Sequence, residues 1–85
     1  MLVARKGSVI ESNIHGMTAD EAYRELMRLI ERADGSVVEI HVIHGYRRGD
    51  VLKSMVQQRL NHPRISYKCQ SLLNEGETKI YLKKR

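Results

Sequence analysis

The sequence predicts a single small α/β domain, in which strands and helices follow the order β-α-β-α-β-β. A length of 85 residues is enough for one thin hydrophobic core. Apolar residues recur at helical spacing in two segments, and they alternate or run together in four others. Right-handed crossovers then place both helices on one face of a mixed, four-stranded sheet whose C-terminal strand is antiparallel.

The first half of the chain is expected to contain a tail, a strand and a helix. Residues 1–8 include Arg5, Lys6 and Gly7 without periodicity, which predicts a flexible basic tail ahead of one domain at 9–85. A short strand is expected over 9–14. The tetrad Thr18-Ala19-Asp20-Glu21 is a capping box, in which the Thr18 hydroxyl accepts a hydrogen bond from the Glu21 amide. The apolar spacing predicts a helix over 19–33 that is closed by Asp34-Gly35.

The second half repeats this pattern and ends in a hairpin. Residues 37–43 are almost continuously apolar, which is typical of an interior parallel strand. Asp50 opens a second helix with one apolar face, and this helix ends near Asn61-His62-Pro63 because proline disfavours a helical residue before it. Residues 65–72 and 78–82 alternate as strands do, and Asn74-Glu75-Gly76 marks the turn between them.

Composition indicates the kind of partner. The formal net charge is +5 and the sequence pI is about 9.7, which favours a polyanionic partner such as DNA or RNA, with no preference between the two. No apolar run approaches the roughly 20 residues that cross a membrane, so no membrane partner is expected. A single cysteine excludes an internal disulfide and a multi-cysteine zinc site. These features predict a cytoplasmic protein, and they leave its oligomeric state open.

Two similar turns are the most informative motif. Ile14-His15-Gly16 and Ile43-His44-Gly45 each connect a strand to the following helix. If the two strands are parallel neighbours, both turns lie at their carboxyl ends, where open α/β sheets bind ligands. Two imidazoles, two helix N-termini and Arg47-Arg48 would then surround an oxyanion, above all a phosphodiester.

The same residues allow catalysis. A histidine pair can exchange protons near neutral pH, and RNA supplies its own nucleophile in the 2′-OH group. Cleavage of DNA would instead require a divalent metal ion. A metal site of His15 and His44 would need a third ligand such as Glu11 or Asp50. Each His-Gly pair can also be a plain turn. Strand parity makes the two histidines unequal, because His44 shares a side with the apolar residues of its strand and His15 does not.

The motifs resemble those of the Smr (small MutS-related) domain family, over about residues 9–82. Ser12-Asn13-Ile14-His15-Gly16 matches the family's Leu-Asp-Leu-His-Gly motif, and His44-Gly45-Tyr46-Arg47-Arg48-Gly49 matches its His-Gly-x-Gly-type turn in the form found in short stand-alone members. The resemblance implies a β-α-β-α-β-β sandwich similar to the C-terminal domain of bacterial translation initiation factor three. It also implies nucleic-acid binding or endonuclease activity on DNA or RNA.

The resemblance and the turn together give the candidate site residues. His15 and His44 are the candidate catalytic residues. The candidate nucleic-acid-binding residues are Gly16, Gly45, Tyr46, Arg47, Arg48, Gly49 and Lys53. Two residues depart from the family pattern: Asn13 replaces an aspartate, and Arg47 replaces a glycine. Both changes favour binding over cleavage.

Three functions are therefore considered. A nucleic-acid-binding module that grips the phosphodiester backbone is preferred, and an endonuclease with His15 and His44 as acid and base is the first alternative. A protein-interaction module on a ribosome or a DNA-repair complex is the second. No cofactor is expected except a divalent metal ion in the nuclease case.

Overall fold

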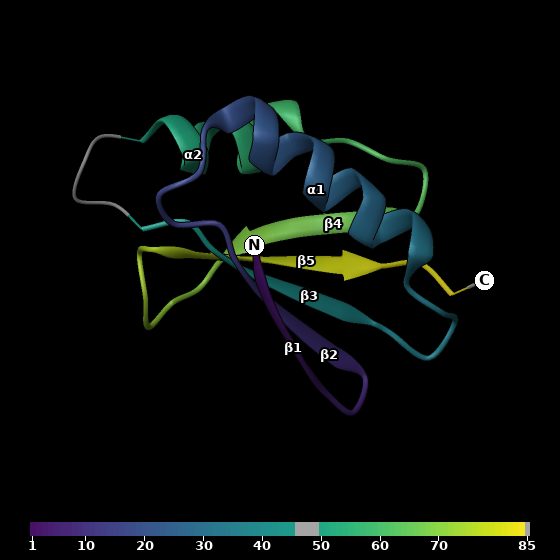
Figure 1. The fold of residues 1–85 in the computed structure, drawn as a ribbon. Coiled ribbons are helices and arrows are strands. Elements are labelled where there is room, and N and C mark those ends of the chain that lie inside the picture. Colours follow the sequence, from purple (N-terminus) through teal and green to yellow (C-terminus); the bar gives the residue numbers. More distant parts are fainter. Residues whose placement is uncertain (46–49, 85) are drawn as a thin grey trace.

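A five-stranded sheet covered on one face by helices forms the fold (Figure 1). The structure is a computed structural model that describes residues 1–45 and 50–84. Its elements are β1 (Leu2–Lys6), β2 (Val9–Asn13), α1 (Ala19–Arg32), β3 (Glu39–Ile43), α2 (Val51–Ser54), the π-helical turn η1 (Met55–Arg59), β4 (Ile65–Gln70) and β5 (Glu77–Leu82). The strand order in the sheet is β1-β2-β3-β5-β4. Among the described residues, no helix is both long and apolar enough to cross a membrane.

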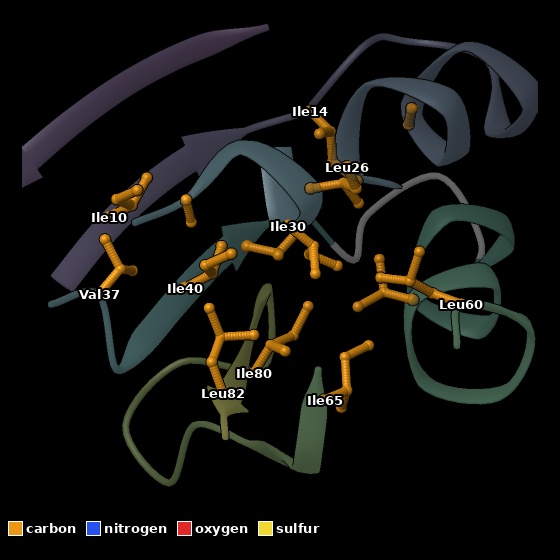
Figure 2. Packing of buried hydrophobic residues seen from close by; sticks show 14 of the residues in the cluster. Ile10, Ile14, Leu26, Ile30, Val37, Ile40, Leu60, Ile65, Ile80 and Leu82 are labelled. Carbon is orange, nitrogen blue, oxygen red and sulfur yellow. The ribbon is translucent and has the colours of Figure 1, made fainter. Parts of the chain in front are cut away.

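The predicted α/β architecture is confirmed from β2 onward. Strands β2 and β3 are parallel neighbours, and β5 runs antiparallel to both β3 and β4. Ile10, Ile40 and Ile80 stand side by side on three adjacent strands and pack under the helices. Figure 2 shows Leu26 and Ile30 of α1 meeting this layer from above. The core therefore fixes β2 and β3 in register, and this register aligns the turns that follow them.

The prediction of four strands with a flexible tail over residues 1–8 is wrong. Residues 2–6 form β1, which pairs antiparallel with β2 from Leu2 opposite Asn13 to Lys6 opposite Val9. Gly7 and Ser8 make the two-residue turn, in which Gly7 has a φ of 63°. Gly-Ser between two extended runs is a hairpin signal, which the basic character of the segment obscures. Arg5 anchors the strand, because its Nη1 lies 2.9 Å from Oδ2 of Asp34 at the end of α1.

The start of α1 is as predicted, but its end is not. Thr18 is the N-cap, and its Oγ1 accepts a hydrogen bond of 3.2 Å from the Glu21 amide. The helix ends at Arg32 with extended backbone at Ala33, and Gly35 does not adopt the left-handed conformation of a closing glycine. The buried Arg64 guanidinium caps this helix end instead, because it donates hydrogen bonds to the carbonyls of Ile30, Ala33 and Asp34.

The second helix is shorter and wider than the predicted continuous helix. It has one α-helical turn, α2, which passes into the π-helical turn η1, where the Leu60 amide donates to the Met55 carbonyl over 2.7 Å. Lys68 on β4 explains how this turn ends, because its Nζ lies 2.9 Å from the Val56 carbonyl and 2.6 Å from that of Leu60. A lysine on a neighbouring strand thus satisfies carbonyls that the widened turn leaves open.

Candidate nucleic-acid interface

The two His-Gly turns lie against each other at one end of the sheet. The Ile14 amide donates to the Ile43 carbonyl over 3.0 Å, which continues the β2–β3 ladder to the start of both turns. The His15 ring then covers Gly45 so closely that a Cβ atom at Gly45 would lie 2.9 Å from His15 Cδ2. Gly45 has a φ of 78°, a conformation that side chains rarely adopt. The parallel strands therefore bring His15 and the His44-Gly45 turn together, and glycine leaves room for the imidazole. We call this place the mouth: residues 13–16 and 44–45.

His44 is an internal residue of the mouth. Its side of β3 faces the helices, and it is only 3% exposed. Nδ1 lies 2.8 Å from the Gly45 carbonyl and Nε2 lies 2.8 Å from Thr78 Oγ1. Because a carbonyl only accepts, Nδ1 carries a proton and donates it. Gln57 Nε2 donates to the same Thr78 oxygen over 3.1 Å, so the Thr78 hydroxyl is free to donate to Nε2 of a neutral His44.

The electrostatic surroundings favour the neutral form of His44. Burial lowers its pKa, and the nearby charge of Lys53 lowers it further, while the hydrogen bond to Gly45 and the charge of Glu77 act in the opposite direction. Both ring nitrogens already have partners inside the protein. The physical role that this arrangement supports is holding the turn in shape, because neither nitrogen faces solvent for proton exchange with a substrate.

His15, in contrast, is exposed at the rim of the mouth. Its backbone amide donates to Asn13 Oδ1 over 2.9 Å, and the Met17 amide donates to the Ile14 carbonyl over 3.0 Å. Gly16, with a φ of 86°, completes the tight turn into α1. The side-chain oxygen at position 13 thus shapes the turn, a task that the amide of Asn13 performs as an aspartate would. The inequality of the two histidines follows the strand parity seen in the sequence.

The charges around the mouth are mixed. Lys53 on α2 is partly exposed, and its positive charge lowers the pKa of His44. Glu77 at the start of β5 is also partly exposed, and its negative charge raises that pKa. The helix ends contribute less than the sequence indicated. The first turn of α1 carries Asp20 and Glu21, and α2 has only four residues, with no side-chain hydrogen bond from its N-cap Asp50. Cationic side chains, more than helix dipoles, would therefore attract an anion here.

Four predicted binding residues, Tyr46, Arg47, Arg48 and Gly49, lie outside the described residues. Of the others, Gly16 and Gly45 are in the mouth and Lys53 is beside it. Within residues 1–45 and 50–84, no three His, Cys, Asp or Glu side chains are grouped to hold a metal ion.

Three supporting residues were not identified from the sequence. The Gly76 carbonyl accepts hydrogen bonds from the amides of His44 (2.8 Å) and Gly45 (3.0 Å), and Thr78 and Gln57 complete the contacts of the His44 ring. Thr78 shares strand parity with the buried Ile80, which is the only local sign that it points inward. Thr78 lies 34 residues from His44 in the sequence, and Gly76 is almost as distant. Gln57 is nearer but belongs to the next helix, so no local motif links the three residues to His44.

An open hollow adjoins the mouth through Asn13. Its volume is about 230 Å³, and its lining residues are Leu2, Val3, Ala4, Glu11, Asn13 and Ile43. Most of them belong to the edge of the sheet at β1 and β2. The hollow is therefore an open depression beside the mouth.

Comparison with known proteins agrees with this arrangement. The family model of the Smr domain matches residues 12–82, which include both His-Gly turns, the end of β2 and the strands β3, β4 and β5. The chain belongs to the Smr domain family. The crystal structure of the Smr domain of Thermus thermophilus MutS2 is similar, with a TM-score of 0.77 and 20% sequence identity over 86% of this chain and 96% of that chain. No functionally curated protein matches the sequence.

The Smr family is associated with nucleic-acid binding and nuclease activity. The likeness to MutS2, at 20% identity, concerns the fold alone. Strand β1 lies wholly outside the matched segment, which begins at Ser12. In this Smr domain, β1 forms the edge of the sheet next to β2.

Proposed function

We propose that this Smr domain binds the phosphodiester backbone of DNA or RNA at the mouth. The observation that carries the proposal is the contact between the exposed His15 imidazole and Gly45, which joins the two turns into one surface. The excess of positive charge, +5 for the chain, supports a polyanionic ligand.

Each described residue has a distinct part in this proposal. The His15 ring N–H donates to a phosphate oxygen from the rim, and Gly16 lets the backbone approach without a side chain in the way. Lys53 contributes a charge beside the mouth. His44 is a positioning residue, because its hydrogen bonds to the Gly45 carbonyl and Thr78 hold the surface on which His15 lies.

Binding is proposed ahead of cleavage because the two imidazoles are in different environments. A two-histidine mechanism needs both rings at the reacting phosphodiester, with one donating and one accepting a proton. His44 is 3% exposed and has internal partners at both nitrogens, whereas His15 is exposed. A single accessible imidazole is sufficient to contact a phosphate. Cleavage would also need a second group for the other proton transfer, and the described residues do not place one beside His15.

The test is equilibrium binding of labelled single- and double-stranded DNA and RNA over a range of salt concentrations. We expect an affinity that falls steeply with salt and a weaker affinity for the His15→Ala variant. Lys53→Ala should reduce the magnitude of the log–log salt slope by about 1, because one phosphate contact is lost. Absence of any salt-dependent binding by the wild-type protein would refute the proposal.

Arg32→Ala is the matched control for charge. Arg32 is exposed in the last turn of α1, and the 14-residue helix places it about 20 Å from the end that faces the mouth. Removing this charge should leave the salt slope unchanged within error.

Cleavage is followed in the same samples, with and without Mg²⁺. Turnover that disappears in both His15→Ala and His44→Gln would favour the nuclease, and a partner retained after nuclease treatment would favour a protein-interaction module.

A further inference from the structure

The loop between β4 and β5 carries two neighbouring leucines that nothing in the described structure covers. Leu72 is 100% exposed and Leu73 is 98% exposed. Neither takes part in the hydrophobic core. Side chains of this kind usually mark a surface that meets a partner when they occur together.

The loop that presents them is braced at its base. The Ser71 amide donates to the Glu77 carbonyl over 3.1 Å, and the Glu77 amide donates to the Asn74 carbonyl over 3.2 Å. Asn74 Oδ1 also accepts a hydrogen bond of 2.9 Å from the Gly76 amide. These bonds close the loop beneath the leucine pair, which stands at its tip.

The loop is attached to the mouth. Its Gly76 carbonyl accepts hydrogen bonds from the amides of His44 and Gly45, so the base of the loop and the second His-Gly turn are held together. Figure 1 shows the β4–β5 loop at the same end of the sheet as the segment that leads into α1. The leucine pair therefore lies on a loop that is hydrogen-bonded to the second His-Gly turn.

We propose that Leu72 and Leu73 form an apolar wedge that contacts nucleic-acid bases while the mouth holds the backbone, so that the domain prefers distorted or unpaired sites. This inference rests on the proposed function. In a nucleic acid, the bases are the apolar part, and leucine is among the side chains that insert between base steps. The chain has no Trp or Phe that could serve as a stacking platform. Tyr67 and Tyr81, which stack with centroids 4.4 Å apart, contact each other on β4 and β5 and are not at the loop tip.

The partner is taken to be nucleic acid because the wedge adjoins the candidate phosphate site of a basic chain. Glu75 lies in the same loop, and its negative charge repels the phosphodiester backbone of the ligand. The bases of the ligand, more than its backbone, are therefore expected to contact the leucine pair. A protein or a lipid that covered the leucines would not need the mouth. Nucleic-acid binding and protein or lipid binding can therefore be distinguished by whether loss of the leucines changes nucleic-acid binding.

The experiment compares wild-type protein with the Leu72→Ser/Leu73→Ser double variant. Both are titrated onto DNA and RNA duplexes that contain 2-aminopurine beside a bulge, and onto the same duplexes without the bulge. The wild-type protein should bind the bulged duplex about tenfold more tightly and increase 2-aminopurine fluorescence as the base unstacks. The double variant should lose both effects but keep the salt slope of the wild type. Because both side chains are exposed, folding should be unaffected, and circular dichroism checks this.

Val38→Ser is the matched control. Val38 is 36% exposed and precedes β3, at the end of the sheet opposite the mouth. Its variant should behave as the wild type does. Equal fluorescence and equal bulge preference in the wild type and the double variant would overturn the wedge and leave backbone binding standing. No binding by the wild type would overturn the proposed function itself. Leucine-dependent capture of a protein or of vesicles, with nucleic-acid binding unchanged in the double variant, would also overturn the wedge.

Discussion

Alanine at Gly45 should displace the His15 ring without unfolding the domain. Gly45 has a φ of 78°, and left-handed backbone costs a residue with a side chain about 1–2 kcal/mol. Alanine also restricts the unfolded chain, which returns about 0.4–1 kcal/mol. The expected net loss of unfolding free energy is therefore about 1 kcal/mol, equivalent to a melting temperature lower by about 4–8 °C for a domain of this size.

The added methyl group has a second, local effect. It would lie 2.9 Å from His15 Cδ2, and ordinary contact begins at 3.4 Å, so the ring has to withdraw by about 0.5 Å. Since His15 is exposed, this movement costs little stability. It does change the surface that we propose for phosphate, and binding should weaken more than stability does.

Two other glycines provide controls with the same strain. Gly16 has a φ of 86° and Gly7 a φ of 63°, and a Cβ atom at either position meets nothing within 4 Å. All three Gly→Ala variants should lose similar stability in urea unfolding. Gly45→Ala should shift the His15 imidazole resonances in two-dimensional NMR spectra, whereas Gly7→Ala, which is remote from His15, should not. Equal shifts in Gly7→Ala, or none in Gly45→Ala, would refute the contact between the two turns.

Three further predictions concern buried polar groups and the helix cap. The pKa of the folded-state His44 lies below its ordinary value of 6.5. As the pH falls below 6.5, the unfolded chain therefore binds more protons than the folded protein does. Wild-type stability should therefore decline from pH 6.5 down to the pKa of the folded state, and in His44→Gln this component of the decline should be absent. Lys68→Met should reduce the free energy of unfolding by about 1–3 kcal/mol, because the carbonyls of Val56 and Leu60 lose their donor. Thr18→Ala should cost about 1 kcal/mol in the same urea titration, through loss of the N-cap.

These predictions have specific contrary outcomes. A pH profile of His44→Gln that is parallel to that of the wild type between pH 5 and 7 would show that His44 is not held neutral. Lys68→Arg is the control for the lysine, because it keeps a donor; equal losses in the Met and Arg variants would implicate packing instead of the two carbonyl contacts. An unchanged midpoint for Thr18→Ala would remove the cap from the account of how α1 begins.

The fold was largely predictable because its elements carry local signals. The capping box fixed the start of α1, and the apolar run of β3 indicated an interior strand. The end of α1 was not predictable, because it depends on Arg64, a residue 30 or more positions further along the chain. The π-helical turn likewise depends on Lys68, which no local pattern connects to Leu60. Contacts distant in sequence, more than local propensity, decided both features.

The candidate site was predictable in position more than in chemistry. Two His-Gly turns after parallel strands had to meet, and His15 does contact Gly45. Strand parity also indicated that the histidines are unequal. The state of His44 could not be derived, because it depends on burial beneath the helices and on the Thr78 hydroxyl group on β5. The sequence contains this hydroxyl group, but only the folded sheet shows that it faces the imidazole.

The pairing of β1 with β2 has a practical consequence for handling this protein. Leu2 lies opposite Asn13, whose side chain shapes the first turn, so the amino terminus emerges beside the mouth. Leu82 instead pairs with Ile65, and its amide donates to Val38 at the other end of the sheet. A tag, fluorophore or tethered protein joined ahead of Met1 would crowd the proposed ligand, whereas one joined after the last residue would extend away from it. Immobilisation through the carboxyl terminus is therefore the orientation that leaves both turns and the leucine tip accessible to a nucleic acid in solution.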